Sequence, residues 1–372
     1  MSDAPAPVPR LSRRKKVAFA CFMALVPLLL AEGCLRFADL AKGQTLRAHA
    51  PDLFLYQEDP DAGYALRPGV AFQGLNPASG VHSYHINSLG FRGAEFPQPK
   101  PAGEFRVLCL GGSSTFGAFG HVSDEETWPV FLERELRRRR PAVRVINAGT
   151  PGYSLFESRA QFEGSLLALQ PDLVLVYQGW NDLKVLAGIA RGKGWKPRRP
   201  GPQGLWTGVL KYSVLYLTIR NRILLPMYDT EGGRRGEAGE GPPLEAVPLE
   251  AWPAWEQEVE LLSATCKSRG LGLVFARELS LIKEKPASEE EARAADRALG
   301  MQRPFSKHAV VAGLSECVRR LRDHPGIRFC PLEGVEANLG TMVDHVHLRP
   351  YGNQCVAESL AKFLIDGGFV QE

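Results

Sequence analysis

From residue 104 onward, short apolar segments alternate with helical ones, and this pattern constrains the fold more than any other feature. The apolar segments lie at 105–110, 143–148, 172–178, 271–276 and 326–332. Helical stretches lie at 131–140, 158–169, 255–270, 306–323 and 352–365. Fully apolar strands separated by helices are typical of a parallel sheet covered on both faces. The pattern predicts an α/β domain over 104–372 whose ligands bind at the carboxyl ends of the strands.

Two regions depart from this alternation. Residues 183–250 form a predicted insertion with Gly-, Pro- and charge-rich ends. Within it, the apolar stretch 210–225 is expected to pack as a helix against the core or over the site. Residues 39–103 form an N-terminal extension that ends in the Pro-rich linker "PQPKPAG" (97–103).

The N-terminus combines a basic tail, residues 1–16, with an uncharged run at 17–31. Of the 45 Lys and Arg and the 41 Asp and Glu, the tail holds five and one, so it carries the whole net charge of +4. A neutral remainder argues against a nucleic-acid partner. A basic flank before an apolar run is typical of a membrane segment whose N-terminus stays in the cytoplasm.

The length of that run leaves two interpretations. A helix over 17–31 is about 22 Å long, which is less than the roughly 30 Å hydrocarbon core. We expect "EGCLRFADL" to complete a transmembrane signal anchor over 17–38, with Glu32 and Arg36 reaching the interface. A cleaved signal peptide is the alternative. Either way, the folded domain is predicted on the periplasmic or extracellular side.

The seven cysteines show no metal-type spacing, so neither a metal nor a disulfide is expected, and no cofactor motif stands out. The turn "GGSSTFG" (111–117) lacks the lysine of a phosphate-binding Walker loop. It matches the dinucleotide fingerprint only loosely, because "NAGTPG" rather than an acidic residue follows the next strand. Taken alone, the turn is equally compatible with a purely structural role.

Three other polar segments also lie beyond strand ends or before the last helix. They read "NAGTPGYS" (147–154), "GWND" (179–182) and "DHVHLRPYGN" (344–353). With the serine turn they resemble, in order and placement, the signature blocks of the SGNH, or GDSL, hydrolase superfamily, over roughly 104–366. The upstream "INSLGFRG" (86–93) resembles a segment of membrane-anchored members. The resemblance implies a flavodoxin-like three-layer α/β/α fold with about five parallel strands.

The resemblance also implies roles for individual residues. Ser113 matches the nucleophile, His347 the general base and Asp344 the residue that orients it. The backbone of Ser113 and Gly152 and the side chain of Asn181 match the oxyanion-binding donors. Gly112 departs from the family pattern, since many members carry aspartate there. His345 is expected to be an exposed residue rather than the base.

These roles predict a serine esterase that hydrolyses an O-acyl ester through an acyl-enzyme. An envelope-carbohydrate O-acetyl group or a lipid ester is the expected substrate, and Trp180 is a candidate substrate-binding residue. Trp195 and Trp206, in the insertion, are equally compatible with sugar stacking and with loop anchoring. Two alternatives stay open, an O-acyltransferase with the same triad and an inactive binding or assembly factor. The oligomeric state is not predicted.

Overall fold

The computed structural model describes residues 12–49, 51–76, 80–117, 122–197, 205–224, 243–301 and 305–371. Residues 1–11 of the predicted basic tail therefore lie outside the described residues. Of the predicted insertion, 198–204 and 225–242 also lie outside them.

Five parallel strands form the central sheet, in the order β6-β5-β7-β8-β9. Their bounds are β5 Phe105–Gly111, β6 Val143–Asn147, β7 Leu173–Gln178, β8 Gly272–Arg277 and β9 Arg328–Cys330. The order is that of flavodoxin-like folds, with β5 between β6 and β7. The predicted fold class and all five predicted strands are confirmed.

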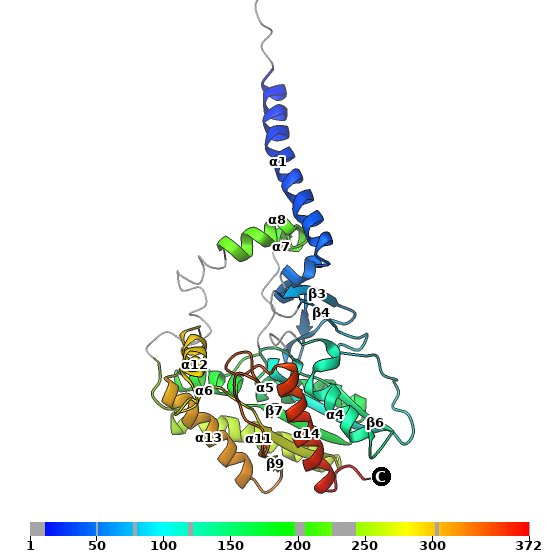
Figure 1. The fold of residues 1–372 in the computed structure, drawn as a ribbon, viewed down its shortest axis with the longest axis vertical. Coiled ribbons are helices and arrows are strands. Elements are labelled where there is room, and N and C mark those ends of the chain that lie inside the picture. Colours follow the sequence, from blue (N-terminus) through cyan, green and yellow to red (C-terminus); the bar gives the residue numbers. More distant parts are fainter. Residues whose placement is uncertain are drawn as a thin grey trace, which may run out of the picture.

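Helices cover both faces of this sheet (Figure 1). On one face α4 (Trp128–Arg137) packs against α14 (Pro350–Asp366). The other face carries α5 (Leu155–Gly164), α6 (Trp180–Ala190), α11 (Trp252–Ser268) and α13 (Lys307–Asp323). The helix α6 extends into the range predicted as an insertion, because its apolar face belongs to the core.

Side chains of β5 alternate between the two hydrophobic layers. Leu108 and Leu110 enter the layer under α5 and α6, whereas Val107 and Cys109 enter the layer under α4 and α14. All four are at most 1% exposed. Burial on both faces explains why the strand is a continuous apolar run rather than an alternating one.

Two antiparallel hairpins precede the sheet. β1 (Tyr56–Asp59) pairs with β2 (Gly63–Leu66), and β3 (Ala71–Asn76) pairs with β4 (Gly80–His85). The remaining short elements are η1 Leu46–His49, α2 Pro51–Phe54, η2 Asp124–Glu126, η3 Leu166–Leu169, η4 Arg220–Leu224, η5 Leu249–Ala251 and α12 Glu289–Met301. The hairpins and the first turns build a separate small cluster around Phe72 and Ile86.

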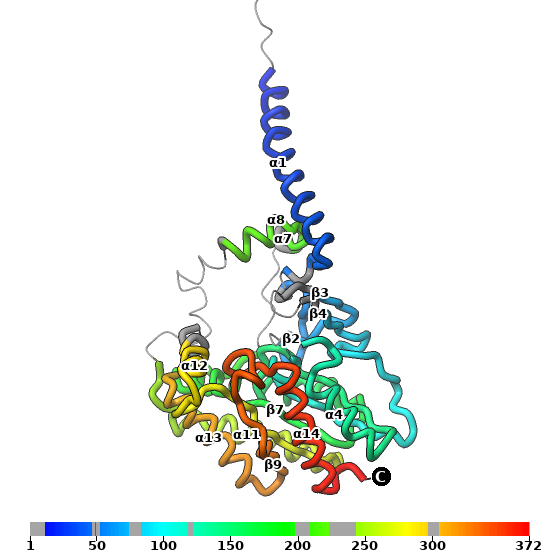
Figure 2. The backbone as a smooth tube through the Cα atoms, in the orientation of Figure 1, coloured from blue at the N-terminus to red at the C-terminus, as the bar shows by residue number. Residues whose placement is uncertain are grey.

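The N-terminal helix α1 (Arg13–Ala41) projects away from the domain, as Figure 2 shows. It contains no buried residue, and its most apolar window has a mean hydropathy of 2.1. Among the described residues it is the one helix with the length and composition to cross a membrane, which a signal sequence would share.

Two short helices of the insertion, α7 (Leu205–Leu210) and α8 (Val214–Ile219), lie beside α1 rather than over the sheet (Figure 1). Leu217 of α8 is fully buried against Phe54 and its neighbours in the N-terminal extension. The prediction that 210–225 packs against the main core or over the site is therefore wrong. The described part of this stretch packs on α1 and on the N-terminal extension instead. The reason is that polar groups on α1 bond to the start of α8.

Candidate active site

The candidate nucleophile lies on a tight turn between β5 and the single-turn helix α3 (Ser113–Phe116). A Cβ on Gly111 would lie 2.2 Å from the Thr115 hydroxyl and 2.5 Å from the Tyr177 carbonyl, so glycine is required there. Thr115 Oγ1 donates to that carbonyl of β7 at 3.1 Å. The turn is therefore locked to the neighbouring strand, and Ser113 follows it at the carboxyl edge of the sheet.

Ser113, His347 and Asp344 form a chain of two hydrogen bonds with His347 in the middle. Ser113 Oγ is 2.8 Å from His347 Nε2, and His347 Nδ1 is 2.7 Å from Asp344 Oδ2. The histidine and the aspartate come from the loop between β9 and α14. In the tautomer that carries its proton on Nδ1, facing the carboxylate, Nε2 accepts a hydrogen bond from the serine hydroxyl.

The Asp344 carboxylate is fixed by more than the imidazole. Its Oδ1 accepts the backbone N–H groups of Val346 and His347, both at 2.9 Å. Burial alone would raise the pKa of Asp344, but the hydrogen bond and charge of His347 outweigh burial and hold that pKa well below its ordinary value. The group is therefore an anion at neutral pH, and it fixes the tautomer of the imidazole.

The candidate oxyanion donors follow β6 and β7. Asn181, in the first turn of α6, donates its Nδ2 to the Tyr153 carbonyl at 2.8 Å. Gln178 Nε2 donates to the same carbonyl at 3.0 Å. Gly152, just before Tyr153, has φ = 90°, a left-handed value that favours glycine. The segment with Gly152 is thus bonded directly to the Asn181 amide.

The surroundings of position 112 explain why a glycine is present there. A Cβ at position 112 would lie 2.7 Å from Asn181 Nδ2 and 3.0 Å from the Tyr153 carbonyl. The aspartate that many family members carry here would displace the amide. The serine turn and the Asn181 side chain are therefore in direct van der Waals contact.

His345 is buried, so the expectation that it is exposed was wrong. Only 4% of it is exposed, and its ring packs edge-on against Trp180 with centroids 4.4 Å apart. Burial lowers the pKa of His345 to about 4, so the ring is neutral at pH 7. Neither ring nitrogen has a hydrogen-bond partner among the described residues. The ring beside the Ser113 hydroxyl is that of His347.

The tryptophans differ in their surroundings. Trp180 is 6% exposed and belongs to the core layer under α6, with Lys184 Nζ 5.6 Å from its ring centroid. Its substrate-binding role stays a prediction. Trp195 stacks on Phe156 and donates Nε1 to Glu157 at 3.1 Å, contacts that anchor its loop. The side chain of Trp206 lies outside the described residues.

Arg92, in the "INSLGFRG" segment, donates hydrogen bonds to the backbone at the end of the serine turn. Its fully buried guanidinium donates to the carbonyls of Phe116 and Gly117, both at 2.8 Å, and to that of Val122 at 2.6 Å. Its Nε donates to Asp124 at 3.0 Å. Sequence reasoning noted the segment but assigned Arg92 no role, because nothing local indicates which carbonyls it would reach.

Glu278 is a second residue that sequence reasoning missed. It directly follows β8 and accepts the Trp180 N–H at 2.6 Å. The hydroxyl of Ser114, the neighbour of Ser113, donates to the Val346 carbonyl at 3.2 Å. Burial raises the pKa of Glu278, while the Trp180 N–H, the nearby Ser114 hydroxyl and the charge of His347 oppose the rise. The other polar segments were singled out because they follow predicted strands. Glu278 also follows a predicted strand, so the same signal could have identified it.

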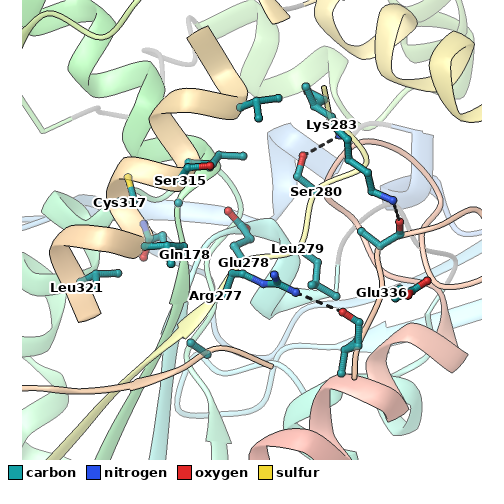
Figure 3. A pocket seen from close by; sticks show the side chains of 18 of the residues that line it. Gln178, Arg277, Glu278, Leu279, Ser280, Lys283, Ser315, Cys317, Leu321 and Glu336 are labelled. Carbon is teal, nitrogen blue, oxygen red and sulfur yellow. Dashed lines mark hydrogen bonds between the residues drawn. The ribbon is translucent and has the colours of Figure 1, made fainter. Parts of the chain in front are cut away.

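A cavity of about 700 Å³ lies between β8, β9 and α13, and Glu278 is one of the residues that line it (Figure 3). Apolar side chains of α13, such as Leu314 and Leu321, form one wall. Arg277 and Lys283 lie opposite and donate to backbone carbonyls of the loop after β9. Glu278 thus lines the cavity and binds the first N–H of α6. No cluster of three or more possible metal ligands occurs in the described part of the chain.

Comparison with known proteins gives one family match. Residues 109–262 match the model of the GDSL-like lipase/acylhydrolase family. No curated protein sequence matches the chain significantly.

Several solved structures are similar to this chain. An acetylxylan esterase from Geobacillus stearothermophilus is 15% identical, with a TM-score of 0.35 over 71% of this chain and 95% of that one. A GDSL-like lipase from Bacteroides thetaiotaomicron is 14% identical, with a TM-score of 0.34 over 73% and 93%. The family match and the parallel-sheet fold lead to one assignment: this chain carries a GDSL-like lipase/acylhydrolase domain and is an ester hydrolase.

Proposed function

We propose that the protein is a serine esterase that removes an O-acyl group through an acyl-enzyme intermediate, with Ser113 as nucleophile. The observation that carries this proposal is the continuous hydrogen-bonded chain from Ser113 Oγ through His347 to Asp344, at 2.8 and 2.7 Å. A serine hydroxyl is a weak nucleophile until a base takes its proton during attack. The distances suit that transfer without rearrangement.

The reaction would proceed in two halves. Ser113 Oγ attacks the ester carbonyl carbon while His347 Nε2 takes the hydroxyl proton, and the resulting imidazolium is stabilised by Asp344. Collapse of the tetrahedral intermediate breaks the bond to the alcohol, which receives the proton from His347. Water then attacks the acyl-enzyme by the same route, releases the carboxylic acid and restores the free serine.

Negative charge on the carbonyl oxygen would be stabilised by the N–H groups of Ser113 and Gly152 and by the Asn181 amide. The contact between Gly112 and Asn181 supports this role, since it places the amide against the serine turn. Such donors act where charge develops, and losing one typically costs about 3–4 kcal/mol of transition-state stabilisation.

The proposed substrates are O-acyl groups on envelope carbohydrate, or lipid esters, outside the cytoplasm. Support comes from α1, which has the length and composition to cross a membrane and has no buried residue. We propose that α1 is an uncleaved anchor. Extraction of membranes with alkaline carbonate tests this, because release of the full-length protein into the supernatant would contradict an anchor.

A fluorophosphonate probe tests the proposed chemistry. The full-length protein should form a covalent adduct, mapped by mass spectrometry to Ser113, and should hydrolyse p-nitrophenyl acetate. Ser113→Ala should lose both properties, whereas Ser359→Ala, on α14, should keep both. A folded protein that fails to react would be a binding factor instead. If a sugar hydroxyl captures the acyl group faster than water does, the product is a new ester and the protein is an acyltransferase.

A further inference from the structure

The segment formed by α7 and α8, residues 205–219, contacts α1 at the end of its apolar run. Glu32, the first residue after that run, accepts the Ser213 hydroxyl at 2.8 Å and the N–H groups of Val214 at 3.0 Å and Leu215 at 2.8 Å. The α7–α8 segment is therefore attached to α1 at the level where its continuous apolar surface ends.

Arg36 strengthens the same junction. Its guanidinium donates to Glu32 Oε1 at 2.6 Å and to the Tyr212 carbonyl at 2.5 Å. Lone charges within a membrane helix are costly, and pairing with hydrogen-bonding partners reduces that cost. Here Glu32 and Arg36 bind each other and the α7–α8 segment instead of extending alone toward water. The junction can thus lie near or within the lipid headgroup region.

The α7–α8 segment has an inner face and an outer apolar face. Val214 and Leu217 are buried on the inner face, at 2% and 0% exposure. Val209, Leu210, Tyr212 and Ile219 remain exposed, with Val209 at 62% and Tyr212 at 56%. Exposed apolar side chains gathered in one short segment are typical of an interaction surface. Tyrosine is also enriched at the boundary between lipid and water.

Two apolar residues of α1 extend this surface beyond Glu32. Phe37 is 73% exposed and Leu40 is 78% exposed, although both follow the charged residues Glu32 and Arg36. The run 17–31 alone covers only about 22 Å of a roughly 30 Å hydrocarbon core. Phe37, Leu40 and the exposed face of the α7–α8 segment supply further apolar surface at the end where the run is too short.

The orientation of the domain fits the same interface. In Figure 1 the α7–α8 segment runs across the direction of α1, beside the lower part of that helix and above the sheet domain. Helix α14 begins on the side of the domain that faces this segment and ends at the far side, next to the C-terminus. Because the loop with Asp344 and His347 directly precedes α14, the candidate site lies on the side toward α1.

We infer that the α7–α8 segment is an interfacial docking element, whose partner is the headgroup boundary of the bilayer that α1 crosses. The inference rests on the proposed anchor and goes beyond the proposed esterase activity. The bilayer covers Val209, Leu210, Tyr212 and Ile219, and the junction at Glu32 fixes the tilt of the domain. The site edge then faces the membrane, where an ester on a lipid or on a membrane-bound glycan would be within reach.

Depth-dependent fluorescence quenching tests the docking. Full-length protein lacking Cys21, Cys34 and Cys355, each replaced by serine, is reconstituted in vesicles of phosphatidylethanolamine and phosphatidylglycerol. An environment-sensitive fluorophore is attached in separate samples to Val209→Cys, to Phe22→Cys within α1, and to Leu261→Cys on α11. Leu261 is the matched control, since it is exposed but lies on the sheet domain. Lipids spin-labelled near the headgroup serve as the quencher.

The expected result is that the labels at 209 and 22 lose most of their fluorescence to the spin-labelled lipids, while the label at 261 keeps its own. Quenching at 22 with a label at 209 that behaves like 261 would overturn the docking and leave the anchor standing. No quenching at 22 would overturn both. Hydrolysis of p-nitrophenyl acetate by the same samples reports on the esterase independently, so failures of the two proposals are distinguishable.

Discussion

The contact between Gly112 and the Asn181 amide leads to a prediction opposite to the one suggested by the family pattern. Many relatives carry aspartate at the position of Gly112, so a side chain there would be expected to be harmless. In this structure a Cβ at 112 would lie 2.7 Å from Asn181 Nδ2, whereas ordinary contacts begin at 3.4 Å. The amide would have to retreat by about 0.7 Å, and the Tyr153 carbonyl at 3.0 Å limits the space for doing so.

The magnitude follows from the proposed role of that amide. A misplacement of about 1 Å in a catalytic group can cost roughly 10²-fold in rate. Removal of an oxyanion donor costs about 10²- to 10³-fold in kcat. We therefore expect Gly112→Ala to lower kcat by about 10- to 100-fold, with KM little changed, because the amide acts on charge that develops in the transition state. The backbone φ of −90° at Gly112 lies outside the left-handed region that favours glycine, so the effect of alanine comes from its Cβ.

Steady-state hydrolysis of p-nitrophenyl acetate, with thermal unfolding as a check on folding, measures this effect. Gly194→Ala is the matched control, since a Cβ there would meet nothing within 4 Å. The double variant Gly112→Ala/Asn181→Ala should be no slower than Asn181→Ala alone, because the first change acts through the second residue. Full activity of Gly112→Ala, or an additive loss in the double variant, would refute the reasoning.

Three further predictions concern neighbouring residues. His347→Ala should lower kcat by orders of magnitude in the same assay, whereas His345→Ala should do so far less, and reversed effects would show that the wrong histidine was assigned as base. Burial holds the pKa of His345 at about 4, below its ordinary value of 6.5. Between these two pH values the unfolded chain binds more protons than the folded protein. The folded state therefore loses stability as the pH falls from 6.5 to 4. Urea unfolding should show that His345→Phe removes about 3 kcal/mol of this acid destabilisation between pH 6.5 and 4. Arg92→Met should reduce the free energy of unfolding by about 3–5 kcal/mol, because it removes the guanidinium that donates to Asp124 Oδ1 and to three backbone carbonyls. Arg138→Met at the surface should be nearly neutral.

Local sequence alone determined the layered architecture and the location of the site. Strands buried on both faces must be apolar throughout, and the helices between them must carry one apolar stripe. Both requirements produce patterns that can be recognised in the sequence. The polar segments at strand ends follow from the same logic, because parallel strands all end at one edge. Ser113, Asn181 and the loop of His347 could therefore be placed together before any contact was known.

Tertiary structure alone decided which neighbours those residues have. His345 and His347 are two positions apart, yet one packs on Trp180 and the other reaches Ser113, and only the path of the loop separates them. The roles of Gly112, Arg92 and Glu278 likewise depend on atoms far away in the chain. The attachment of α8 to Glu32 joins residues about 180 positions apart. Periodicity records which face of an element is buried, but the partner that buries it is set by long-range packing, which no local pattern encodes.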